Sequence, residues 1–151
     1  MKDFKNINEI LDFAIQNEQQ AADFYEKLSN DSKEKTMRDM FAQFSEEEKG
    51  HKARLLKIKD EGVYEAKKED ILDMKISDYL VSVKASDTMT YQEALILAMK
   101  REKAAFKLYM KLAKIAPSEE FVTLFRNLAN EEAKHKMHFE LEYDDVIYKG
   151  N

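Results

Sequence analysis

Two copies of a Glu-x-x-His motif are the residues of this chain best suited to chemistry. One copy is Glu48-x-x-His51 and the other is Glu132-x-x-His135. Residues three apart on a helix point to the same side, so each motif would place a carboxylate beside an imidazole. Both groups are common metal ligands. Each motif also interrupts a stripe of apolar residues, where an ionisable group is costly unless something pairs with it.

Two further glutamates, Glu18 and Glu102, interrupt apolar stripes in the same way. Four carboxylates collected at one place carry four negative charges, which two divalent cations would cancel. Without metal, burial and mutual repulsion would force these groups to take up protons. The predicted metal ligands are Glu18, Glu48, His51, Glu102, Glu132 and His135. We expect Glu48 and Glu132 to bridge two ions, with Glu18 and Glu102 as terminal ligands.

The ligand types narrow the choice of metal. Mixed oxygen and nitrogen ligands suit iron or manganese. The chain has no Cys, which removes iron–sulfur clusters, Cys-rich zinc sites, disulfides and a Cys nucleophile. The ligand types therefore predict a pair of divalent ions, either iron or manganese.

The two halves of the chain repeat at one fixed offset. A separation of 84 residues joins Glu18 to Glu102 (102 − 18) and His51 to His135 (135 − 51). The same separation joins Glu48 to Glu132. This period is too long and occurs too few times for a solenoid. It indicates a duplicated helix hairpin.

Four long helices must position these side chains. Apolar residues at intervals of three and four predict helices over about 7–29, 32–60, 90–115 and 118–144 or slightly beyond. Residues 61–89 are expected to form a crossover with one or two short helices, because a structureless loop of this length is rare in a compact domain. We therefore predict one all-α domain over 1–151, a ferritin-like four-helix bundle. Its two hairpins span about 6–60 and 90–147.

Turn and capping residues mark the predicted helix ends. Asn6 with Glu9, and Thr90 with Glu93, have the spacing of capping boxes. Gly62 is a plausible stop for the second helix.

The overall composition excludes several partners. The formal net charge is −5, and no basic stripe is present, so we expect neither nucleic acid nor an anionic membrane surface as a partner. The N-terminus lacks an apolar signal region, and no apolar run is long enough to cross a bilayer. A cytoplasmic protein is expected.

Several residues beside the predicted ligands allow two interpretations. Tyr25 and Tyr109 lie two turns beyond Glu18 and Glu102, and each could pack in the core or bond its hydroxyl to a ligand carboxylate. Glu47 and Glu131 follow the repeat but lie about 100° from the apolar stripe. They could face solvent or support the ligands from outside. His138 has no His counterpart in the repeat, and we expect it on the surface.

At these residues the chain resembles the rubrerythrin-type branch of the ferritin-like superfamily over nearly its whole length. The resemblance rests on four features: Glu18 with Tyr25, Glu48-x-x-His51, Glu102 with Tyr109, and Glu132-x-x-His135. It implies an oxo- or hydroxo-bridged di-iron centre, a homodimer, and the reduction of hydrogen peroxide to water.

The chain departs from the rubrerythrin pattern in two ways. Rubrerythrins usually carry a second Glu three residues after the third helix's ligand, where this chain has Ala105. The remaining four Glu and two His look more like bacterioferritin. Rubrerythrins also commonly carry a rubredoxin domain with four Cys, and this chain has none. Electrons are therefore expected from an external donor protein.

Three functions remain open from the sequence. The first is a peroxide-reducing oxidoreductase in which the six ligands act through the metal centre. The second is a ferroxidase or iron-storage protein that reacts with oxygen. The third is a metal-binding module without enzymatic activity.

Overall fold

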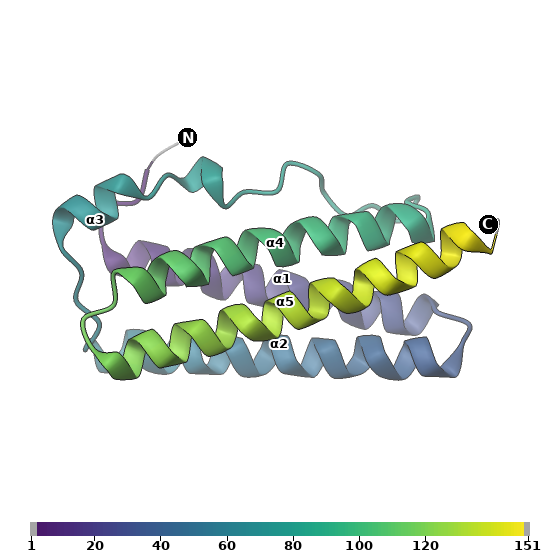
Figure 1. Cartoon of the computed structure of the whole chain (residues 1–151), viewed down its shortest axis with the longest axis horizontal. Helices are drawn as coiled ribbons and strands as arrows, with labels where there is room; N and C mark the ends of the chain where they lie inside the picture. Colours follow the sequence, from purple (N-terminus) through teal and green to yellow (C-terminus); the bar gives the residue numbers. More distant parts are fainter. Residues whose placement is uncertain (1–2, 150–151) are drawn as a thin grey trace.

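A computed structural model describes residues 3–149, and four long helices confirm the predicted all-α bundle (Figure 1). The helices α1 (Ile7–Asp31) and α2 (Lys35–Glu61) pack together as one hairpin. The helices α4 (Tyr91–Lys114) and α5 (Glu119–Tyr148) pack as the second. No helix in this described part of the chain is long and apolar enough to cross a membrane.

The crossover between the hairpins carries two short helices, α3 (Lys68–Asp73) and the 3-10 helix η1 (Ile76–Asp78), as predicted. Figure 1 shows it running back along the bundle beside α4. It is held to α4 by the Tyr64 hydroxyl, which donates to the Leu112 carbonyl at 2.7 Å. Met74 and Tyr79 bury their side chains against the bundle as well. The crossover therefore covers one side of the helices.

Side chains fix the starts of the two hairpins. The Thr90–Glu93 capping box is complete, with hydrogen bonds of 2.9 and 3.1 Å. The Asn6 side chain accepts from the Glu9 amide at 2.9 Å, as predicted. The Glu9 carboxylate, however, accepts from the Lys5 amide rather than from Asn6, so the first box is only half formed.

The second helix begins at Lys35, later than the predicted start near Ser32. Ser32 ends α1 instead. Its amide and its hydroxyl both donate to the Leu28 carbonyl, at 3.0 and 2.8 Å, and so satisfy a carbonyl at the helix end. The first helix consequently extends past the predicted end at Ser29.

The core consists of two apolar clusters with a polar layer between them. Along α1, Leu11 belongs to one cluster and Tyr25 to the other, with Glu18 between them. Along α5, Phe125 and Phe139 stand in the two clusters in the same way. The ionisable residues therefore lie in the middle of the bundle, shielded from water by apolar side chains on both sides.

Candidate metal centre

The structure brings all six predicted ligands together in this polar layer. Each of their side chains is at most 2% exposed. They form two groups whose ligand atoms all lie within 4.8 Å of one another: Glu18, Glu48, His51 and Glu132 in one group, and Glu48, Glu102, Glu132 and His135 in the other. The groups share Glu48 and Glu132. Two overlapping groups of this kind fit a dinuclear metal site, and the shared pair occupies the place that bridging carboxylates would take.

Around His51, three carboxylates converge on one nitrogen. Its Nδ1 lies 2.9 Å from Glu18 Oε2, 3.0 Å from Glu132 Oε1 and 3.2 Å from Glu48 Oε1. Among residues 3–149, none of these four buried atoms has a hydrogen-bond partner. Buried oxygen and nitrogen atoms are normally satisfied. A metal ion would satisfy all four at once, so the residues present fit a bound metal.

The second group repeats this arrangement around His135. Its Nδ1 lies 3.3 Å from Glu48 Oε1 and 3.4 Å from Glu102 Oε2. These three atoms also lack hydrogen-bond partners within the part of the chain that the structure describes. The duplication seen in the sequence therefore produces two similar half-sites, one beside each histidine.

Glu47 and Glu131 contact the outer nitrogens of the two histidines. Glu131 Oε2 lies 3.5 Å from His51 Nε2, and Glu47 Oε1 lies 3.5 Å from His135 Nε2. Each glutamate reaches across from the other hairpin. A carboxylate at this position orients a ligating imidazole and fixes its tautomer. Glu47 forms such a hydrogen bond with His135. Among the described residues His51 Nε2 has no hydrogen-bond partner, so Glu131 is its neighbour without a bond to it.

Tyr25 and Tyr109 are buried, and their hydroxyls bond to ligand carboxylates. Tyr25 on α1 donates to Glu102 on α4, and Tyr109 on α4 interacts in the same way with Glu18 on α1. Burial and the nearby carboxylates raise the pKa of both tyrosines well above its ordinary value. Both hydroxyls therefore remain protonated donors and hold Glu102 and Glu18 in place.

Burial dominates the electrostatics of the carboxylates. Burial raises the pKa of Glu18, Glu48 and Glu132, and repulsion from neighbouring carboxylates adds to the rise at all three. Burial alone would lower the pKa of His51 and His135, but the surrounding carboxylates outweigh it and raise both values. The metal-free centre therefore holds protons, which a metal ion would displace on binding.

The sequence analysis did not identify Phe44 as a neighbour of the ligands. Its ring stacks on that of His135, with centroids 4.2 Å apart. The helical spacing of Phe44 predicted only a core residue, because a ring that stacks on a ligand and a ring that packs in the core occupy the same apolar position in the sequence pattern. His138 is exposed, as predicted, and its ring lies 5.7 Å from that of Phe44.

The sequence analysis also did not anticipate the cavity of about 180 Å³ that adjoins the centre, formed by α1, α4 and residues 79–84 of the crossover. Ala105, where rubrerythrins usually carry a further glutamate, lines this cavity and is half-buried. Arg101, next to the predicted ligand Glu102, lines it as well. Only its position beside a ligand could have drawn attention to Arg101.

Comparison with known proteins places the chain in a family. The family model described as Rubrerythrin matches residues 9–143, which is most of the chain. No curated protein and no solved structure matches the chain significantly.

Proposed function

The chain belongs to the rubrerythrin family, and from that premise we propose that it is a di-iron oxidoreductase that reduces hydrogen peroxide to water. The observation that carries the proposal is the pair of buried ligand groups that share Glu48 and Glu132. Electrons would come from an external donor protein, because the chain has no Cys to hold an iron–sulfur centre of its own. We also propose that the protein is a homodimer.

Two iron ions, when bound, would supply one electron each, and with two protons the O–O bond of hydrogen peroxide would break to give two water molecules. The four carboxylates neutralise the two divalent charges. The hydroxyls of Tyr25 and Tyr109 hold the terminal glutamates in fixed orientations. Glu47 orients the imidazole of His135 through a hydrogen bond at 3.5 Å, and Glu131 lies close to the imidazole of His51. The apolar clusters exclude water from the two ends of the centre along the bundle.

A second candidate is a ferroxidase or iron-storage protein that reacts with oxygen. The observation in its favour is Ala105, which supplies no ligand where rubrerythrins usually have one more glutamate. The four-Glu, two-His set that remains is the one that looks like bacterioferritin. Manganese in place of iron is compatible with the same ligands.

Rapid-mixing absorbance on protein loaded anaerobically with Fe(II) separates these candidates. For a peroxidase we expect fast oxidation by hydrogen peroxide, saturating at two irons per chain, and slow oxidation by oxygen. Fast oxidation by oxygen that continues beyond two irons per chain would favour the ferroxidase. Size-exclusion chromatography provides a second distinction, because a storage protein forms a very large assembly rather than a dimer.

The Glu48→Ala, Glu132→Ala double variant tests the site itself. It removes both shared carboxylates, so we expect metal to raise the melting temperature of the wild type but not that of the variant. If metal stabilises both proteins equally, the proposed site is wrong. Another outcome is that metal stabilises only the wild type while the bound Fe(II) is oxidised by neither peroxide nor oxygen. That outcome would indicate a metal-binding module without enzymatic activity.

A further inference from the structure

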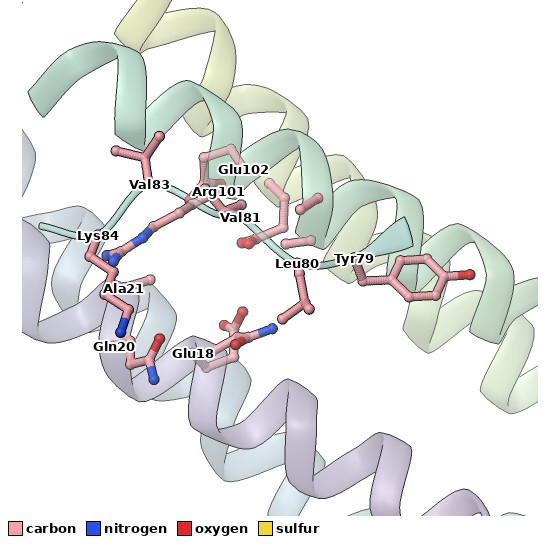
Figure 2. A pocket seen from close by; sticks show the side chains of 14 residues that line it. Glu18, Gln20, Ala21, Tyr79, Leu80, Val81, Val83, Lys84, Arg101 and Glu102 are labelled. Carbon is pink, nitrogen blue, oxygen red and sulfur yellow. The ribbon is translucent and has the colours of Figure 1, made fainter. Parts of the chain in front are cut away.

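The cavity beside the centre connects the protein surface with the predicted ligands. Its inner wall includes the buried residues Glu18, Glu102 and Glu132, and its outer wall includes the exposed Val83 and Lys84. Figure 2 shows the space between α1, α4 and the crossover, with the side chains of Glu18 and Glu102 directed into it. A molecule in this cavity would therefore lie next to the metals.

Small side chains create this space. Ala21 and Ala105 stand three residues after Glu18 and Glu102, so each lies on the same side of its helix as a ligand. Both alanines line the cavity. Its volume is about 180 Å³. A protein cavity of about 150 Å³ can hold benzene, so a ligand of a few heavy atoms fits here.

Two cationic side chains at the cavity lack an anionic partner. The Arg101 guanidinium is half-buried and lies 4.9 Å from the centre of the Phe24 ring. Within residues 3–149, neither Arg101 nor Lys84 forms a hydrogen bond or an ion pair with another side chain. Figure 2 shows both side chains extending toward the same end of the cavity. A partly desolvated guanidinium binds anions through strong, charge-assisted hydrogen bonds.

Amide side chains add further donors at this position. Asn17 and Gln20 on α1 line the cavity, and Figure 2 shows Gln20 near Lys84. When two divalent ions neutralise the four carboxylates of the centre, the charges of Arg101 and Lys84 remain uncompensated. An anion between them would reduce this net positive charge.

We infer that this cavity binds a small monovalent anion, such as formate, nitrite or azide, through Arg101 and Lys84 beside the metal centre. The binding does not require the proposed peroxidase reaction. A route for metal entry is the other use of such a cavity, and the experiment below distinguishes it from anion binding.

Zinc-loaded protein provides the test, because zinc takes no part in redox chemistry. Its metal content is measured first, and sodium azide is then titrated while NMR follows the Arg101 Nε–Hε resonance and the amides of residues 81–84. We expect saturable shifts at these positions. The Arg101→Gln variant should have a dissociation constant for azide at least about tenfold higher, because a charge-assisted contact is lost. Lys84→Gln should weaken binding by a smaller factor.

Arg126→Gln is the matched control. Arg126 is an exposed arginine of α5 outside the cavity, so azide affinity should not change. Azide affinity that is equal in the wild type and in Arg101→Gln would mean that the metals alone bind the anion, and it would overturn the inference. The absence of any azide-dependent shift would overturn it too. Faster zinc uptake by Arg101→Gln at unchanged azide affinity would assign the cavity to metal entry instead.

The inference and the proposed function fail in separate experiments. Azide binding to the zinc protein does not depend on any oxidation, so a negative peroxide assay leaves it intact. A protein that reacts with peroxide but binds azide independently of Arg101 would keep the function and lose the anion site.

Discussion

At the scale of single residues, the centre holds charged groups where the protein would otherwise be apolar. Glu48 and Glu132 are completely or almost completely buried, and the nearest groups to them are further carboxylates and imidazoles. Such an arrangement opposes the stability of the metal-free protein, because burial and like charges both disfavour the ionised form. The arrangement becomes favourable once divalent cations are bound.

Glu48→Gln should make the metal-free protein more stable while impairing metal binding. Glutamine has nearly the same shape but no charge, so it relieves repulsion from Glu18 and Glu102. We expect the free energy of unfolding without metal to rise by about 1–3 kcal/mol near neutral pH. Bound metal should fall below two ions per chain.

Urea denaturation and elemental analysis of the two proteins measure these changes. Glu46→Gln is the control, because Glu46 is exposed and pairs only with Lys49 nearby, at 3.1 Å. Its effect should stay within about 0.5 kcal/mol. A Glu48→Gln protein that is less stable without metal, yet binds a full complement of it, would contradict the assignment.

Tyr25→Phe should weaken metal binding by about tenfold, because the variant loses the hydroxyl that orients Glu102. Tyr109→Phe should act similarly through Glu18. Competition with a chromophoric chelator measures the affinity. Tyr64→Phe loses a buried hydrogen bond to Leu112, so it should lower stability by about 1 kcal/mol. Metal affinity in Tyr64→Phe should remain unchanged, and a loss equal to that of Tyr25→Phe would show a general effect of destabilisation.

At the scale of helices, the ends of each element decide which side chains meet. The second helix must end where the crossover begins, and Gly62 ends it with a φ of 64°. Its amide donates to the Ile58 and Lys59 carbonyls at 3.2 Å. A left-handed residue directly after a helix satisfies carbonyls that have no partner within the helix.

Alanine substitutions at Gly50, inside α2, and at Gly62, its C-cap, should change stability in opposite directions. Gly62→Ala forces a side chain into a left-handed conformation and should cost about 1–2 kcal/mol. Gly50 lies inside the helix, and an added methyl group meets nothing within 4 Å. Gly50→Ala should therefore stabilise the protein by about 0.5–1 kcal/mol. Thermal and urea unfolding of both variants check the signs, and two changes of the same sign would contradict this explanation.

At the scale of the whole molecule, stability, protons and metal are linked. The polar layer divides the core into two apolar clusters, so its ionisation state affects both hairpins. Without metal, the raised pKa values of three glutamates and both histidines mean that the folded protein binds more protons than the unfolded chain. The stability that these protons contribute is lost as the pH rises.

The metal-free protein should therefore melt at a lower temperature at about pH 8 than at about pH 6. The stability contributed by the protonated carboxyls is lost above their ordinary pKa of 4.5, and that contributed by the protonated histidines is lost above their ordinary pKa of 6.5. Both losses follow because the pKa values in the folded protein are raised. Metal displaces the protons and should remove this dependence. The stabilisation by metal should thus grow with pH, which calorimetry can measure. A metal-free melting temperature that rises over this range would refute the link.

The sequence alone determined the helices, the duplication and the candidate ligands. Helical periodicity is a local property, so an ionisable residue on an apolar stripe, such as Glu18, is visible without coordinates. The offset shared by His51 and His135 showed that the two halves are equivalent. The late start of α2 was missed because Ser32 can either begin a helix or end one. Its tertiary surroundings decide between these roles.

Only the tertiary structure decided which side chains meet across the bundle. It showed that Tyr25 bonds to Glu102 rather than to a carboxylate of its own helix, and that Glu47 bonds to His135 of the other hairpin. It also revealed the cavity that Arg101 shares with the crossover. Spacing along one helix gives the direction of each side chain from that helix only. The contacts between helices depend on how the helices are rotated and how far apart they pack, which no single segment encodes.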